Sequence, residues 1–149
     1  MNVVTRLVVA LAVAGAATGI GYAVHDMRDA GAANASSVLG PGLVDVTIDI
    51  HHSAFSISSL RVRAGSVVRF TIRNTDPIEH EFIVGPQSVH DAHERGTEAV
   101  HPPIPGEVSI DPLDVGETFY RFDQPGRVLF ACHLPGHFKY GMHGWITVT

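Results

Sequence analysis

The stretch ACHLPGHFKYGM, residues 131–142, places a thiol, an imidazole and a thioether at Cys132, His137 and Met142. Cys132 is the only cysteine of the 149-residue chain, whereas ten residues are histidines. The Pro135-Gly136 pair predicts a turn between Cys132 and His137, so the segment is expected to form a loop that directs all three side chains to one point. Soft sulfur atoms suit Cu(I) and imidazoles also suit Cu(II), so this donor set favours copper.

A trigonal copper site of two imidazoles and one thiolate, with a weak axial methionine, needs a second histidine from elsewhere in the chain. His80 is the best candidate. It follows a strand-stop sequence, Asn74-Thr75-Asp76-Pro77, and begins the next apolar run, residues 80–84. We therefore expect His80 to lie at the end of the folded domain where the loop after Cys132 also lies.

Apolar and polar residues alternate with a period of two over much of the chain, which is typical of half-buried strands. The expected strands cover residues 44–50, 60–62, 68–72, 81–84, 108–110, 118–122, 127–132 and 145–149. Short strands separated by turn signals predict an all-β fold, an antiparallel Greek-key sandwich or barrel. One long loop interrupts it, from Gly85 to Gly106, within which residues 91–100 can form a short helix.

The domain organisation follows from the N-terminal third. Residues 7–24 carry no charge and follow Arg6, which indicates a secretory signal or a membrane anchor within residues 1–29. Residues 30–42 are small and turn-rich and are interpreted as a linker, so residues 43–149 are left as one folded domain. We expect export to the periplasm or the extracellular space, or anchoring to the outer face of the cytoplasmic membrane through residues 7–24. The net charge of −5 provides no basic footprint for nucleic acid.

The motifs together resemble the cupredoxins, the plastocyanin/azurin-like blue copper proteins. The matching segments are residues 63–70, 74–80, 132–142 and the closing strand 144–148. The resemblance implies one type 1 copper bound by His80, Cys132 and His137, with Met142 as axial ligand. It further implies a one-electron carrier rather than an enzyme, with a redox partner that docks near His137.

Two residues depart from the family pattern and leave alternatives open. Residue 81 is Glu, where many members carry Asn or Asp beside the first ligand, so the support of the ligand loop is an open question. His133 directly follows Cys132, as in larger copper enzymes in which that histidine holds a second copper. A small copper oxidase or reductase with a second copper between subunits is therefore one alternative.

A second alternative is a copper-trafficking protein that uses additional histidines as a second metal site. The candidates lie outside the predicted ligand set, at His51, His52, His90, His93 and His101. We favour a solvated polar loop as the explanation of these residues.

Overall fold

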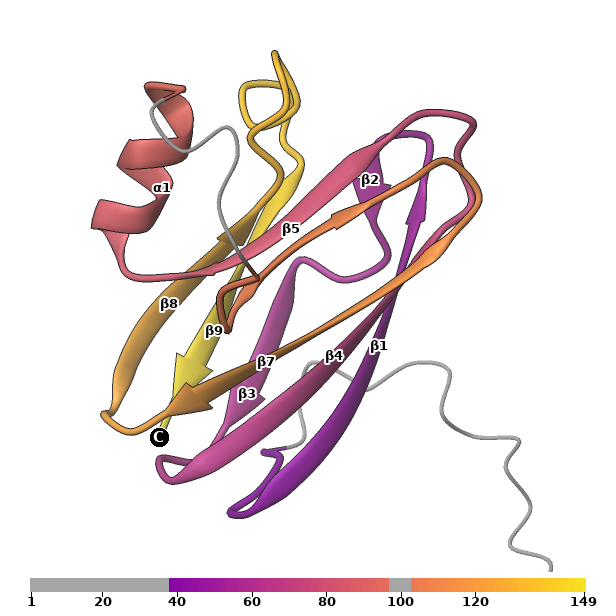
Figure 1. Ribbon diagram of the computed structural model, residues 1–149. Coiled ribbons are helices and arrows are strands. Elements are labelled where there is room, and N and C mark those ends of the chain that lie inside the picture. Colours follow the sequence, from indigo (N-terminus) through magenta and orange to yellow (C-terminus); the bar gives the residue numbers. More distant parts are fainter. Residues whose placement is uncertain (1–37, 97–102) are drawn as a thin grey trace, which may run out of the picture.

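Two β-sheets face each other in the computed structural model, which describes residues 38–96 and 103–149 (Figure 1). The first sheet has the order β2-β1-β4-β7 and the second the order β3-β9-β8-β5-β6. The strands are β1 (Leu43–His51), β2 (Ala54–Phe55), β3 (Ser59–Val62), β4 (Ser66–Asn74), β5 (His80–Gly85), β6 (Glu107–Ile110), β7 (Val115–Phe122), β8 (Gly126–Ala131) and β9 (His143–Val148). The predicted all-β sandwich is confirmed.

The hydrophobic core lies between the two sheets and follows the alternation seen in the sequence. On β4, Val68, Phe70 and Ile72 are fully buried, whereas the arginines between and after them point outward. Outward-facing Arg73 pairs with Asp49 on the neighbouring β1. Because the side-chain period of a strand is two, the sequence pattern alone decides which face of β4 is buried.

Both sheets are mixed, which refines the expected antiparallel pairing. β1 pairs with β4 in parallel, and β3 pairs with β9 in parallel, whereas the remaining neighbours are antiparallel. The physical reason is the route of the chain. After β1 and the short β2, the chain crosses to the second sheet to form β3 and returns to form β4, which brings β4 back in the direction of β1.

The long segment between β5 and β6 contains one helix, α1 (Gln87–Glu94), which begins four residues before the predicted start. Its first residue follows Pro86, whose φ of −68° suits the entry to a helix. The helix packs against β5 and β8 and buries His90 against them. This contact explains why the helix begins at Gln87, before the predicted start, and residues 97–100 of the predicted stretch lie outside the described residues.

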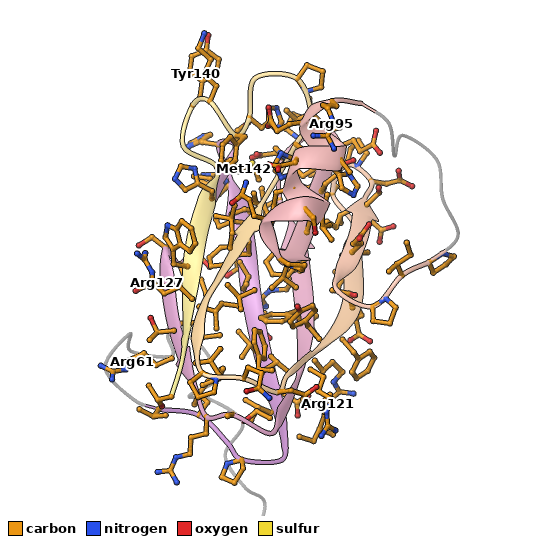
Figure 2. All side chains as sticks on the ribbon, turned by 90° about the vertical axis from the view of Figure 1, so that its left-hand side faces the viewer. Arg61, Arg95, Arg121, Arg127, Tyr140 and Met142 are labelled. Atoms are coloured by element: carbon orange, nitrogen blue, oxygen red, sulfur yellow. The ribbon has the colours of Figure 1, made fainter. Side chains whose placement is uncertain are left out.

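The start of β5, the end of β8 and the start of β9 lie at one end of the sandwich, which we call the His80 end (Figure 1). The register supports this placement, because Ala131 pairs with both Ile83 of β5 and His143 of β9. Tyr140 marks the tip of the loop at this end with Met142 below it, whereas Arg61 and Arg121 lie toward the opposite end (Figure 2).

The predicted signal or anchor and most of the predicted linker lie outside the described residues. Within the described ranges, no helix has the length and apolar character needed to cross a membrane. β1 begins at Leu43, the residue at which the folded domain is predicted to begin.

Candidate metal centre

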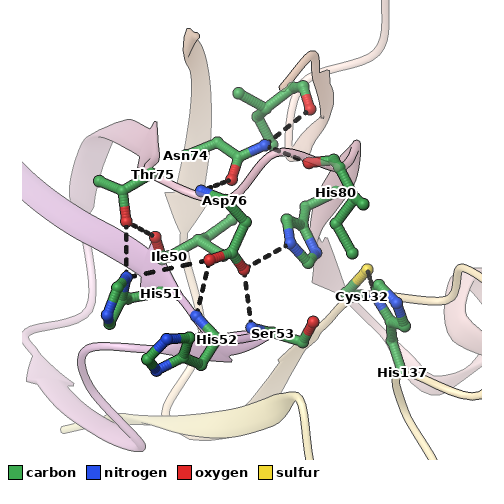
Figure 3. A network of polar contacts seen from close by, with 12 residues as sticks. Ile50, His51, His52, Ser53, Asn74, Thr75, Asp76, His80, Cys132 and His137 are labelled. Atoms are coloured by element: carbon green, nitrogen blue, oxygen red, sulfur yellow. Dashed lines mark hydrogen bonds and ion pairs between the residues drawn. The ribbon is translucent and has the colours of Figure 1, made fainter. Parts of the chain in front are cut away.

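Three of the four predicted ligands meet at the His80 end. Donor atoms of His80, Cys132 and His137 all lie within 4.8 Å of one another. The thiol Sγ of Cys132 is 3.3 Å from Nδ1 of His137, and the two imidazole rings have centroids 5.0 Å apart (Figure 3). Separations of this size allow one metal ion to contact both atoms, since bonds of about 2.0 Å to nitrogen and 2.3 Å to sulfur, as zinc makes, can span them.

Met142, the predicted fourth ligand, is buried in the same hydrophobic core as Cys132. Its backbone connects the ends of the loop, because its carbonyl oxygen accepts the N–H of Cys132 at 3.1 Å and its own N–H donates to the carbonyl of His137 at 3.0 Å. Gly136 and Gly141 adopt φ values of 88° and 97°, a region that glycine enters without steric cost. The predicted turns of this loop are therefore present.

The imidazole of His80 is oriented by a carboxylate. Nε2 of His80 lies 3.0 Å from Oδ2 of Asp76, and a carboxylate can only accept, so this nitrogen carries the proton. Nδ1 of His80 is buried and has no hydrogen-bond partner among the residues that the structure describes. A buried nitrogen lone pair without a partner is costly, and a metal ion is a partner that would satisfy it.

The thiol and the second imidazole are also suited to a metal. Burial raises the pKa of Cys132 to about 11, with the charges of Glu81 and Glu79 adding to the effect and amide hydrogen bonds from Glu81 and Leu134 partly offsetting it. Burial, and then the proximity of His80, lowers the pKa of His137, which keeps its imidazole neutral near pH 7. A metal ion would displace the thiol proton and bind the free nitrogen lone pairs.

Glu81 supports the ligand loop, although it differs from the Asn or Asp that many family members carry at this position. Its backbone N–H lies 3.4 Å from Sγ of Cys132, and its carboxylate accepts the backbone N–H of His133 at 3.3 Å. These two contacts join β5 to the segment that follows β8. The longer side chain of Glu81 therefore connects the two segments although it differs from the residues common in the family.

His133 points into a second group of polar side chains and not toward the donor set. Its Nε2 lies 2.9 Å from Nδ1 of His90 and its Nδ1 lies 2.8 Å from the carboxylate of Glu94. His90 in turn donates from Nε2 to the carbonyl of Leu129 at 3.2 Å. Burial, and then the proximity of His133, lowers the pKa of His90 to about 4. His90 is therefore a neutral residue inside a hydrogen-bonded chain.

Of the other peripheral histidines, His93 stacks its ring against that of His133, with centroids 6.0 Å apart. His93 contacts the carboxylate of Glu107 at 3.1 Å, and His51 lies 3.1 Å from the hydroxyl of Thr75. His101 lies outside the described residues. Across residues 38–96 and 103–149, no second group of three such side chains brings its donor atoms as close as the His80 group does.

Asp76 contacts a predicted ligand, although the sequence alone places it only in a strand-stop turn. Its side chain is 6 % exposed, and its Oδ2 lies 3.0 Å from Nε2 of His80. The available signal was the spacing of a carboxylate four residues before a predicted histidine ligand, because metal-bound histidines commonly donate their other N–H to a carboxylate.

Comparison with known proteins places this site in a family. The family model for copper binding proteins of the plastocyanin/azurin family matches residues 43–149. The copper-resistant cuproprotein CopI of Rubrivivax gelatinosus is 37% identical over 98 residues, which cover 63% of this chain and 59% of that protein. Auracyanin-B of Chloroflexus aurantiacus is 28% identical over 111 residues, which cover 64% of this chain and 47% of that protein. The matches to these two relatives thus span about half to three fifths of their lengths.

Solved structures support the same assignment at the level of the fold. Reduced auracyanin from the photosynthetic bacterium Roseiflexus castenholzii superposes with a TM-score of 0.61 at 21% identity, covering 71% of this chain and 97% of that one. The cluster of His80, Cys132 and His137 fits one type 1 copper site. With the family model covering the whole sandwich, the chain belongs to the plastocyanin/azurin family of copper-binding proteins, the cupredoxins.

Proposed function

We propose that this cupredoxin is an exported one-electron carrier. In this proposal His80, Cys132 and His137 bind a single copper, and Met142 is its axial ligand. The observation that carries the proposal is the cluster of donor atoms from His80, Cys132 and His137, together with the buried Nδ1 of His80, which has no hydrogen-bond partner in the described part of the chain. Copper bound there would alternate between Cu(I) and Cu(II).

The chain supports electron transfer by holding the donors in place before the metal arrives. The loop from Cys132 to Met142 is closed by its own backbone hydrogen bonds, and His80 is fixed by Asp76. A donor set that is held in this way changes shape little when the charge of the metal changes, which keeps the reorganisation energy low.

A partner surface surrounds His137, which is the least buried of the three clustered ligands. Leu134, Pro135 and Phe138 lie on the same loop, and Tyr140 is 87% exposed at its tip (Figure 2). Apolar and aromatic groups around an accessible ligand suit a weak and transient contact with a redox partner. We propose that the partner docks on this surface.

Export is supported by the uncharged run of residues 7–24 after Arg6. The only thiol is also compatible with an oxidising compartment, because it is buried from solvent and the chain has no second cysteine with which it could form a disulfide. The proposed location is the periplasm or the extracellular space, with residues 7–24 as a removable signal or as a tether to the outer face of the membrane.

Copper binding in copper resistance is a second candidate, because a relative at 37% identity is named a copper-resistant cuproprotein. This role would use the same copper site but would not require rapid electron exchange. A copper enzyme with a second copper on His133 has less support, since both ring nitrogens of His133 already have partners in His90 and Glu94.

The deciding experiment is a visible spectrum of the Cu(II) protein together with metal stoichiometry and voltammetry. We expect one copper per chain, an intense charge-transfer colour from thiolate to copper, and a reversible one-electron couple. Cys132→Ser should lose the colour, and Arg121→Gln, which alters an exposed residue toward the opposite end of the sandwich (Figure 2), should keep it. A colourless Cu(II) complex of the intact protein would refute the type 1 site, and a coloured protein without a reversible couple would favour the resistance role.

A further inference from the structure

The carboxylate of Asp76 makes three short contacts although its residue is only 5 % exposed. Oδ1 accepts the backbone N–H of His52 at 2.7 Å, and Oδ2 accepts the backbone N–H of Ser53 at 2.7 Å. Oδ2 also accepts Nε2–H of His80 at 3.0 Å (Figure 3). One buried side chain therefore connects the turn after β1 to a predicted copper ligand at the start of β5.

The turn that Asp76 contacts is conformationally demanding. His52 and Ser53 join β1 to β2, and both have positive φ values of 51° and 53°. Two-residue hairpin turns of this kind usually contain Asn or Gly, because other side chains are strained at positive φ. Here the two N–H groups of the turn converge on one carboxylate, which stabilises the conformation.

Three N–H donors converge on the carboxylate of Asp76, from the backbone of His52 and Ser53 and from Nε2 of His80. Donors arranged in this way favour the charged carboxylate over the protonated acid. A negative charge is thus held inside the protein one imidazole away from the donor cluster. Charges act over such distances more strongly in the interior than in water, because the effective dielectric constant is lower.

We propose that Asp76 is a positioning residue of the copper site, which fixes the orientation of His80 and favours Cu(II) over Cu(I). By accepting Nε2–H, it leaves the lone pair of Nδ1 directed at the cluster. Its charge makes the imidazole of His80 a stronger donor and stabilises the more highly charged metal ion. The inference rests on the copper site of the proposed function, but it does not require that the protein carries electrons.

The test compares Asp76→Asn with the intact protein. Asparagine has nearly the same shape and keeps one acceptor oxygen, but it removes the charge. We expect Cu(II) to bind about ten- to a hundredfold more weakly, and Cu(I) affinity to change much less. For a one-electron couple, each tenfold selective loss of Cu(II) affinity raises the reduction potential by about 59 mV. Asp49→Asn is the matched control, since it removes the same charge from a solvent-accessible position on β1 paired with Arg73.

A second pair of variants separates orientation of His80 from stabilisation of the turn. In a His52→Gly/Ser53→Gly background the turn adopts positive φ without strain, so it no longer depends on Asp76. Asp76→Asn in this background should cost less stability than in the native turn, while the loss of Cu(II) affinity should persist. If the effect on copper disappears in the glycine background, Asp76 acts only through the turn, and the inference is wrong.

The remaining outcomes are also decisive. Equal Cu(II) and Cu(I) losses, or a potential that moves no more for Asp76→Asn than for Asp49→Asn, would overturn the inference and leave the electron-carrier proposal intact. If the intact protein shows no reversible couple, the electron-carrier proposal fails, and the Cu(II) and Cu(I) affinities of the same variants still decide the role of Asp76.

Discussion

Buried His90 should make the stability of the protein fall between pH 6.5 and about pH 4. Its Nδ1 faces Nε2 of His133, and its Nε2–H is used by the carbonyl of Leu129, so a second proton would have to enter a buried ring beside another imidazole. In the unfolded chain His90 binds that proton with a pKa near 6.5, whereas in the folded protein the pKa is about 4.

The sign and size follow from linkage. Between the two pKa values the unfolded state binds more protons than the native state, so the free energy of unfolding decreases as the pH falls. The full difference corresponds to about 3 kcal/mol, which is present above the unfolded pKa and is lost by the time the pH falls through the folded value. This is a large share of the free energy of unfolding of a typical folded domain, which is about 5–15 kcal/mol.

The assay is urea unfolding of the metal-free protein from about pH 7.5 to about pH 4. His137 also has a lowered pKa and contributes to the dependence, so the informative quantity is the difference between the wild type and His90→Gln. Glutamine does not titrate, so the free energy of unfolding of the variant should lack most of the change of about 3 kcal/mol with pH. This holds even if the variant is less stable than the wild type at every pH. Arg121→Gln, at an exposed residue of β7, should retain the wild-type dependence. An identical pH dependence in His90→Gln and the wild type would refute the reasoning.

Three further predictions concern packing, surface charge and the axial position. Gly144→Ala should lower stability by about 1–3 kcal/mol in thermal unfolding, because the added Cβ overlaps the ring of Phe130. Gly85→Ala is the control and should not destabilise the protein, because the nearest atom to its added Cβ is 3.5 Å away. Equal effects of the two substitutions would contradict the packing argument. Arg73→Ala should cost no more than about 1 kcal/mol, since its ion pair is solvent-accessible, and a larger loss would show an unrecognised role. Met142→Leu should cost less than about 1.5 kcal/mol in the metal-free protein but change the visible spectrum with copper; an unchanged spectrum would argue against axial ligation.

The strands could be predicted because their signal is local. The alternation in β4 fixes both its existence and its buried face, and the succession of short strands and turn signals predicts a sandwich or barrel. The parallel pairing of β1 with β4 could not be predicted from alternation, because it depends on which sheet the intervening strands join. The helix was misplaced for a similar reason, since contact with β5 and β8 decides where α1 forms, and periodicity alone does not.

The same distinction between local signals and long-range packing applies to the residues of the candidate site. Cys132, His137 and Met142 lie on one short loop, so their spacing revealed them, and His80 followed from the strand that it begins. Asp76 was missed because its partners, His52 and Ser53, lie 24 and 23 residues earlier, and a carboxylate in a turn has an adequate local explanation. The contact of His90 with His133 spans 43 residues and required the packing of α1 onto the sheet.

The described chain begins at the end of the sandwich opposite the copper site. Leu39 exchanges backbone hydrogen bonds with Arg61 and Arg63, so the chain is fastened to the sandwich beside β3 before β1 begins. β1 then runs nine residues, roughly 30 Å, to His51 at the His80 end. Anything attached ahead of Val38 therefore joins at the far end from the copper site. If the protein is tethered through that segment, the point of attachment and the copper site lie at opposite ends of the sandwich, so the tether leaves the surface around His137 uncovered at its own end.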